Sequence, residues 1–228
     1  MLDGAAPDVD VLYAAHKRSL APLLRAYEPD LVICLGFRWL MPQEALDVPR
    51  LGAMNVHPSK LPLYRGPIPL PWAVRNGETE IGMTVHRMDA TFDTGAILAQ
   101  APVPLDPAAW TFEEVIPHMA AALQEVIPRA LERIAAAEEG EPQDGDPGVY
   151  AAWFEDDFKQ IDWSKPAREI HNQVRAWSFA GFVGDVEMPV GEVDGETRRI
   201  IRTSLEPAEG TKIETGDGPI WITESEPA

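Results

Sequence analysis

The 228-residue sequence predicts an α/β fold with a mainly parallel sheet, followed by a small β-rich C-terminal segment. Short apolar runs alternate with helical patterns over the first 140 residues, which is typical of α/β sheets. Beyond residue 182 the helical pattern gives way to short β-like runs separated by Gly-containing turns.

In the first part of the chain, strands are expected at 8–14, 31–35, 53–56, 81–88 and 96–103. Helices are expected at 16–27, 42–46, 72–76 and 111–139, the last interrupted or kinked at Pro117 and Pro128. The run 31–35 is wholly apolar, which is typical of a buried parallel strand covered on both faces. A loop dense in Pro and Gly occupies 60–71. These elements predict a Rossmann-like sheet flanked by helices.

The second part begins with an acidic, Pro- and Gly-rich stretch, 138–148, that we interpret as a linker. A helix is expected at 165–177, and strands at 199–203 and 220–223. We therefore expect a main domain over 1–140, a linker and helix over 141–180, and a β-rich segment over 181–228.

The bulk composition argues against several classes of protein. A formal net charge of −18 disfavours nucleic-acid partners, whose phosphates are bound by basic groups. No apolar run reaches the ~20 residues that cross a bilayer, and the N-terminus lacks signal-peptide features, so we expect a cytoplasmic protein without membrane contact. The single cysteine, Cys34, lies in an apolar run and is expected to be a buried core residue. The oligomeric state stays open.

Polar side chains follow the strand at 53–56, where α/β sheets gather their ligands. Asn55 and His57 are two positions apart and therefore face the same side of a strand. Asp93 follows the next strand, whose end can bring its carboxylate beside the imidazole. Taken alone, an Asn and a His at a strand end are more often structural residues.

These three residue types suit the transfer of an acyl group to an amine. Attack on a carbonyl generates an oxyanion, which needs a fixed donor such as the Asn55 amide. His57 can take a proton from the amine or give one to the departing nitrogen. Asp93 against one ring nitrogen would fix the tautomer of His57 and raise its basicity. No Ser or Cys nucleophile is required, because the amine itself attacks.

The remaining histidines are interpreted as structural. His86 lies within a strand without an evident partner, and His16, His118 and His171 lie on helical patterns. No His, Cys or carboxylate pair has the spacing of a metal motif, so no metal site is expected.

Three segments carry a family resemblance: 55–66 (NVHPSKLPLYRG), 82–86 (GMTVH) and 93–100 (DTGAILAQ). In order and spacing they resemble the formyltransferases that use 10-formyltetrahydrofolate. That family includes methionyl-tRNA, glycinamide-ribonucleotide and sugar-amine formyltransferases. The segment 65–72 is more similar to the tRNA and sugar-amine branches than to the purine branch, and 162–177 resembles the segment that follows the catalytic domain in those two branches.

The resemblance implies 10-formyltetrahydrofolate as the formyl donor and Asn55, His57 and Asp93 as the catalytic residues. It also implies that the pterin of the folate lies near two stretches. The first stretch contains Phe37, Arg38, Trp39, Leu40, Met41 and Pro42. The second contains Met88, Asp89 and Asp93.

Two features depart from the family pattern. Lys60 replaces the first leucine of a Ser-Leu-Leu-Pro motif. We interpret it as a solvated loop charge, with contact to an acidic substrate group as the alternative.

The strand–helix–strand unit with which family members open is missing before residue 8, which would leave a strand edge exposed. A misassigned start or a shortened chain is the leading explanation, and a compensating neighbour chain is the alternative.

The sequence favours formyl transfer to the primary amine of a small molecule, such as a nucleotide-linked amino sugar. Methionyl-tRNA formyltransfer is the closest alternative, but the charge of −18 argues against the basic groove that tRNA would need. Hydrolysis of the donor to formate and folate binding without turnover are the other hypotheses.

Overall fold

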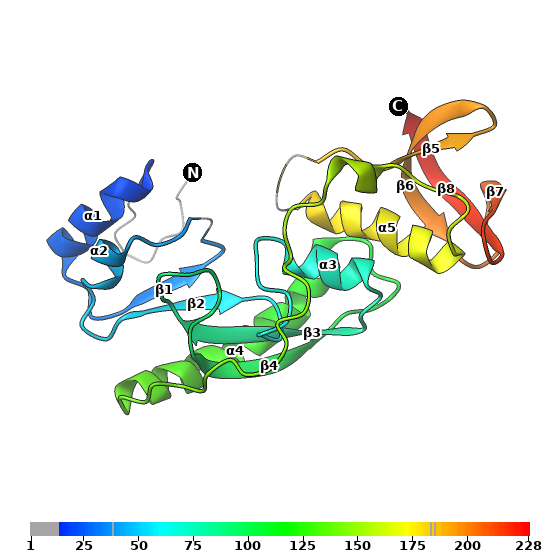
Figure 1. Ribbon diagram of the computed structural model, residues 1–228. Helices are drawn as coiled ribbons and strands as arrows, with labels where there is room; N and C mark the ends of the chain where they lie inside the picture. The colour runs from blue at the N-terminus through cyan, green and yellow to red at the C-terminus, as the bar shows by residue number, and fades with distance from the viewer. Residues whose placement is uncertain (1–13, 38, 183, 185) are drawn as a thin grey trace.

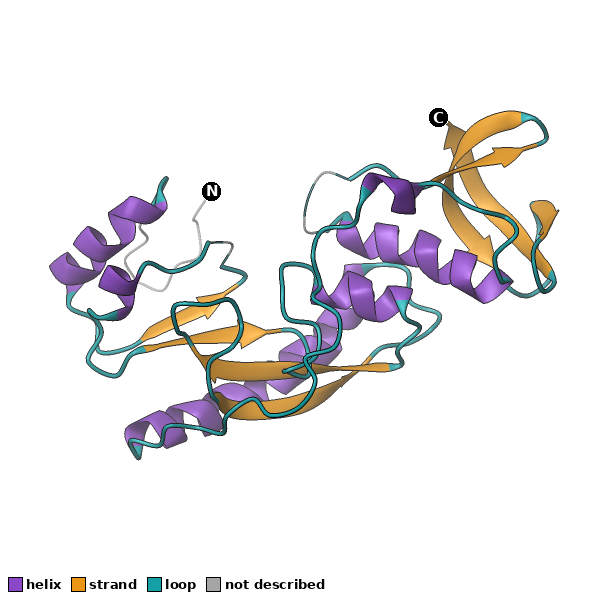
Figure 2. Ribbon diagram, viewed as in Figure 1, coloured by secondary structure: helices purple, strands orange, loops and turns teal. Residues whose placement is uncertain are grey.

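The computed structural model describes residues 14–37, 39–182, 184 and 186–228. These residues form two four-stranded sheets, with strand orders β1-β2-β3-β4 and β5-β6-β8-β7 (Figure 1). Helices accompany both sheets (Figure 2). The α/β class with a β-rich C-terminal segment is therefore confirmed. The strand expected at 8–14 lies almost entirely outside the described residues.

The first elements largely follow the predicted order. A short 3-10 helix, η1 (Lys17–Ser19), leads into α1 (Leu20–Tyr27), and β1 (Val32–Leu35) and α2 (Gln43–Leu46) follow. β1 then pairs in parallel with β2 (Ala53–His57). This parallel pair brings the polar end of β2 beside the segment between β1 and α2.

One face of β1 is exposed, whereas its apolar sequence predicts a strand buried on both faces. Ile33 is 49% exposed and Leu35 66% exposed, whereas Cys34 is buried. Among the described strands, none pairs with the second edge of β1. The prediction of burial on both faces was wrong, because α1 and α2 pack on the Cys34 side of β1 and no described element covers Ile33 and Leu35.

Strand direction differs from the mainly parallel sheet that we expected. β3 (Glu80–Arg87) runs antiparallel to β2, and β4 (Ile97–Pro104) runs antiparallel to β3. The connection 88–96 is shorter than the crossover of about a dozen residues that a parallel pair requires. Helix α3 (Pro69–Arg75) lies in the connection between β2 and β3 and begins earlier than predicted.

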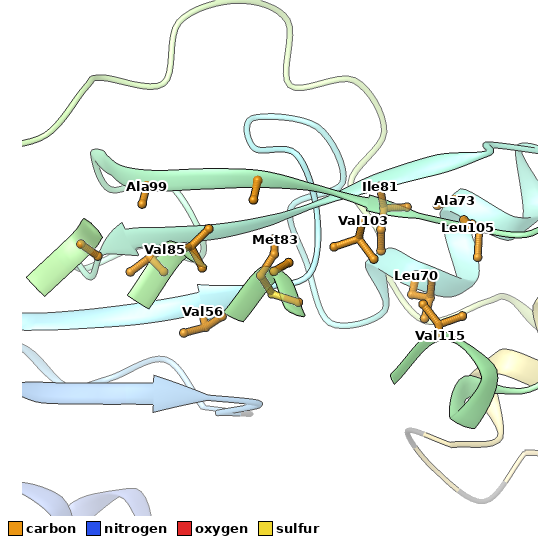
Figure 3. Close-up of a cluster of buried hydrophobic side chains, with 14 of the residues drawn as sticks. Val56, Leu70, Ala73, Ile81, Met83, Val85, Ala99, Val103, Leu105 and Val115 are labelled. Atoms are coloured by element: carbon orange, nitrogen blue, oxygen red, sulfur yellow. The ribbon is translucent and has the colours of Figure 1, made fainter. Parts of the chain in front are cut away.

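The long helix α4 (Phe112–Ala135) packs against β3 and β4. A capping box between Thr111 and Glu114 fixes its start, and the helix continues through both of its prolines without interruption. The buried residues of α4, which are Val115, Ala122, Val126, Ala130 and Ile134, pack into the main core. Figure 3 shows part of this core, with Val115 labelled. Neither α4 nor any other described helix is long and apolar enough to cross a membrane.

The C-terminal segment is β-rich, as expected, and the structure shows that its antiparallel sheet packs on a helix. Helix α5 (Ala167–Ala180) contacts α3 and β6. Around it lie η2 (Asp156–Lys159), β5 (Val190–Val193), β6 (Glu196–Ser204), β7 (Thr211–Glu214) and β8 (Pro219–Pro227). The division of the chain into 1–140, 141–180 and 181–228 stays a prediction.

The stretch 138–148, predicted to be a linker, packs against the first sheet. Glu141 exchanges two backbone hydrogen bonds with Ile97 at the start of β4, of 2.7 and 2.9 Å. Gln143 reaches the loop between β3 and β4. This segment is therefore held in place and is not a free spacer.

Cys34 is buried, as predicted, and burial raises the pKa of its thiol to about 11. Because the thiolate is the nucleophile, we expect iodoacetamide at pH 8 to modify the native protein about 100-fold more slowly than the unfolded chain. Mass spectrometry of samples taken over time would measure both rates. Equal rates in the two states would contradict the burial of this side chain.

Candidate active site

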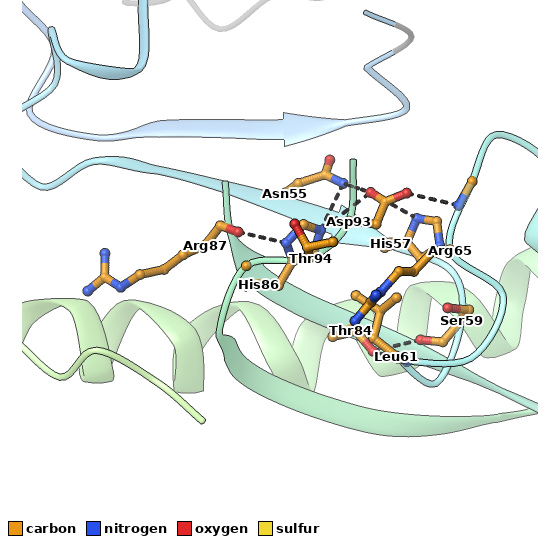
Figure 4. Close-up of polar contacts among 12 residues, drawn as sticks. Asn55, His57, Ser59, Leu61, Arg65, Thr84, His86, Arg87, Asp93 and Thr94 are labelled. Carbon is orange, nitrogen blue, oxygen red and sulfur yellow. Dashed lines mark hydrogen bonds and ion pairs between the residues drawn. The ribbon is translucent and has the colours of Figure 1, made fainter. Parts of the chain in front are cut away.

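Four polar side chains converge around the end of β2 (Figure 4). Asn55 and His57 lie on β2, two positions apart. His86 lies on the neighbouring strand β3, and Asp93 lies in the loop between β3 and β4. The structure thus brings together the three residues that the sequence singles out, and it adds a fourth.

The Asp93 carboxylate is the centre of this cluster. Its Oδ1 lies 3.5 Å from Asn55 Nδ2, 3.7 Å from His57 Nδ1 and 3.6 Å from His86 Nε2. Its Oδ2 accepts a 3.0 Å hydrogen bond from the Gly66 N–H. The His57 and Asp93 side chains are only 6% and 12% exposed. Charges so far from water are screened little, so the titrations of these groups are coupled.

Backbone carbonyls fix the tautomers of both imidazoles. A carbonyl can only accept, so His57 Nε2–H donates to Tyr64 O at 2.9 Å, and His86 Nδ1–H donates to Arg87 O at 2.7 Å. A neutral His57 therefore presents an unprotonated Nδ1 toward Asp93. We expected Asp93 to set this tautomer, but the carbonyl of Tyr64 sets it instead.

Burial has the largest effect on the titration of His57 and Asp93. Burial lowers the pKa of His57 and outweighs the charge of Asp93 and the Tyr64 carbonyl, which raise it. Burial alone would raise the pKa of Asp93, but its contacts with the His86 and His57 imidazoles and the hydrogen bond from the Gly66 N–H together hold that pKa below its usual range. At neutral pH an ionised carboxylate thus lies beside an unprotonated base.

His86 belongs to the cluster, although its sequence context indicates a structural residue. Its Nε2 lies 3.3 Å from Asn55 Nδ2, so a neutral His86 accepts a hydrogen bond from the amide. The two residues are direct partners in the antiparallel register of β2 and β3. An antiparallel alignment of these two strands would have revealed the pair, but the expectation of a mainly parallel sheet concealed it.

The loop that carries Asp93 has a constrained conformation. Asp93 has a φ of 55°, in the left-handed region that costs a non-glycine residue about 1 kcal/mol. A Cβ at Gly95 would lie 1.9 Å from the carbonyl oxygen of Arg87, so only glycine fits there. Asp89 accepts hydrogen bonds of 2.9 Å from Thr91 N and from Thr94 Oγ1. These contacts set the position of the Asp93 carboxylate.

A pocket beside the cluster contains most of the residues expected near the pterin. It is lined by Phe37, Trp39, Leu40, Met41, Asn55, His86, Met88, Asp89, Thr91, Phe92 and Asp93. Pro42 lines an adjoining pocket, and Arg38 lies outside the described residues. Aromatic and apolar walls with a few polar groups suit a flat ring that carries N–H groups.

The pocket encloses about 30 Å³, room for only a few water molecules. A pterin ring therefore requires the loop 88–93 or the aromatic side chains to move aside. The adjoining pocket is larger, about 370 Å³, and shares Leu40 and Met41 with the first. Lys17 and Arg18 also line it, and these cations suit the carboxylates at the outer end of a folate. The donor thus fits the chemistry of these residues.

Within the described ranges, no three His, Cys, Asp or Glu side chains are placed to hold a metal ion. Lys60 is exposed on the loop that follows β2, in agreement with its interpretation as a solvated charge.

Comparison with known proteins identifies the family. Residues 12–131 match the family described as formyl transferase, and residues 155–228 match its C-terminal domain. The chain belongs to the formyl transferase family. The family recognised from the sequence motifs is thus confirmed.

Two curated relatives are methionyl-tRNA formyltransferases. The protein from Synechococcus sp. (strain JA-3-3Ab) is 35% identical, in an alignment that covers 87% of this chain and 66% of the relative. The protein from Pelobacter propionicus is 37% identical over 77% of this chain and 56% of the relative. The chain therefore spans about two thirds or less of the length of these relatives.

Solved structures with the same fold include two formyl transferases and a protein in complex with tetrahydrofolic acid. Methionyl-tRNA formyltransferase from Clostridium thermocellum has a TM-score of 0.62 at 18% identity and covers 84% of this chain and 80% of its own. WlaRD, a sugar 3N-formyl transferase, has a TM-score of 0.66 at 23% identity and covers 89% and 76%. HypX from Aquifex aeolicus, in complex with tetrahydrofolic acid, has a TM-score of 0.69 at 21% identity and covers 92% and 38%. At these identities the likeness concerns the fold.

Proposed function

We propose that this protein transfers a formyl group from 10-formyltetrahydrofolate to a primary amine, with Asn55, His57 and Asp93 as the catalytic residues. Membership of the formyl transferase family supports the reaction class. The observation that carries the proposal is the unprotonated Nδ1 of His57, which lies 3.7 Å from a buried carboxylate and beside a side-chain amide.

The roles of the residues follow from this geometry. The folate supplies the formyl group, which is bonded to its N10. His57 Nδ1 accepts the proton that the amine loses as its nitrogen bonds to the formyl carbon, and Asp93 then stabilises the imidazolium. Asn55 Nδ2 donates to the formyl oxygen as negative charge develops there. His57 returns its proton to the departing nitrogen, so the ring ends the cycle neutral.

Methionyl-tRNA is the acceptor that we propose to test first. The curated relatives at 35% and 37% identity carry that activity in their names. These relatives outweigh the preference for an amino sugar, which rests on net charge.

A nucleotide-linked amino sugar is the second candidate, and the charges of the C-terminal sheet favour it. Arg199 pairs with Glu226 at 2.9 Å, and Lys212 pairs with Glu214 at 2.6 Å. Cations neutralised in this way contribute little to the binding of a nucleic-acid backbone, which depends on basic groups that release counterions, whereas a small nucleotide-linked sugar does not need so extended a basic surface.

The test is a measurement of tetrahydrofolate release from 10-formyltetrahydrofolate with charged initiator methionyl-tRNA and, separately, with a nucleotide-linked amino sugar. Formylated product identified by mass spectrometry would name the acceptor. Formate release without an amine would indicate hydrolysis. Folate binding without any release would refute the proposed function in favour of a non-catalytic binder.

A further inference from the structure

Gln143 links two loops of the active site. It lies between α4 and η2, in the stretch that the sequence predicts to be a linker. Its Nε2 donates to the carbonyl oxygens of Asp93 and Gly95, both at 2.8 Å. Its Oε1 accepts from Arg65 Nε at 3.0 Å and from Arg65 Nη2 at 2.7 Å. One side chain therefore bridges the loop that carries Asp93 and the loop that follows β2.

The Gln143 amide can satisfy these partners in one orientation only. Its two N–H groups face two carbonyls, and its oxygen faces a guanidinium, so its donors and both lone pairs are used. A carboxylate at this position would place an oxygen against two carbonyl oxygens. An apolar side chain would leave both carbonyls and Arg65 without these partners.

Asp93 is a residue that requires such support. A non-glycine residue in the left-handed region persists only where its surroundings hold it there. Gln143 binds the backbone carbonyl of Asp93 itself. It also binds Arg65, and the next residue, Gly66, donates its N–H to Asp93 Oδ2. Gln143 thus restrains both the backbone of Asp93 and the group that binds its carboxylate.

We propose that Gln143 is a positioning residue, which holds the Asp93 carboxylate against His57 by binding the Asp93 and Arg65 loops together. The expected kinetic effect rests on the formyl transfer proposed above, whereas the effect on the Asp93–His57 contact does not. The imidazoles of His57 on β2 and His86 on β3 face the Asp93 carboxylate, and the Arg65 guanidinium contacts Gln143. Displacement of Asp93 therefore changes the charge that both imidazoles experience.

The test compares Gln143→Met with Gln173→Met. The first variant removes four hydrogen bonds at nearly constant volume. Gln173 is a matched control because its Nε2 also donates to two backbone carbonyls, those of Phe158 at 2.6 Å and Gln160 at 3.1 Å, but from α5, outside the cluster. Should either Met variant fail to fold, the pair Gln143→Glu and Gln173→Glu replaces it, because Glu keeps the shape and loses the donors.

The first readout is the titration of the His57 ring, followed by NMR on the protein without substrate. The charge of Asp93 raises the pKa of His57, so displacement of Asp93 should lower that pKa by about half a unit or more in the Gln143 variant alone. The second readout is kinetic. We expect kcat to fall about 10- to 100-fold, with both KM values within about twofold of wild type.

These readouts separate the inference from the proposed function. A His57 shift confined to the Gln143 variant supports the positioning role, even if the wild-type protein releases no tetrahydrofolate, in which case only the proposed function fails. Equal shifts of the His57 pKa in both variants would indicate a general loss of packing and would overturn the inference. An unchanged titration with unchanged kcat in an active enzyme would also overturn it.

Discussion

Asp93→Asn is expected to lower kcat by about 10³- to 10⁴-fold, because it removes the charge that stabilises the imidazolium of His57. Asparagine has nearly the same shape, and its oxygen can still accept from the Gly66 N–H. Its amide N–H, however, would donate to His57 Nδ1, the atom that must receive the proton of the amine. The variant should therefore fold and bind the donor while it loses turnover.

Steady-state kinetics with saturating donor would measure this loss, and donor binding can be followed separately by fluorescence. Asp162→Asn is the control, because Asp162 accepts a 2.9 Å backbone hydrogen bond from Ser164 in an exposed turn outside the cluster. That variant should keep wild-type kcat. An Asp93→Asn variant with more than about a tenth of the wild-type kcat would contradict the role of the carboxylate.

His57→Gln is expected to lower kcat about 10²- to 10⁴-fold, the usual contribution of a positioned general base. The glutamine amide can replace the Nε2–H donor to Tyr64 O, so the loop after β2 should keep its conformation. No atom of glutamine accepts a proton near neutral pH, which isolates the acid–base function. His118→Gln on the exposed part of α4 is the control and should leave kcat unchanged.

The pH profile of the wild-type enzyme checks the same role of His57. Burial lowers the pKa of His57 below 6.5, and the base must be unprotonated to act. With both substrates saturating, so that the titration of the free amine does not enter, kcat should therefore be constant near neutral pH and should fall only below pH 6.5. In Asp93→Asn the fall should move to still lower pH, because the charge that raises the His57 pKa is gone. A wild-type rate that already falls at pH 7.5 would show that His57 is not the neutral base.

Much of the side-chain cluster around Asp93 could be predicted because its signals are local in sequence. Asn55 and His57 are two residues apart on one strand, so alternation alone places them on one face. The fixed spacing from these residues to Asp93 carries the family motif. Apolar periodicity also located strands β1 to β4, the long helix α4 and the β-rich C-terminal segment, since it reports which side of each element is buried.

The tertiary structure alone decided how these segments meet. The antiparallel direction of β3 placed His86 opposite Asn55, the Tyr64 carbonyl fixed the tautomer of His57, and a segment predicted to be a linker supplied Gln143. The exposed face of β1 has the same origin, because its apolar sequence does not specify which elements pack on each face of the strand. The physical reason is that apolar patterning determines which side of an element avoids water, whereas strand direction and hydrogen-bond partners depend on the packing of segments that are distant in sequence.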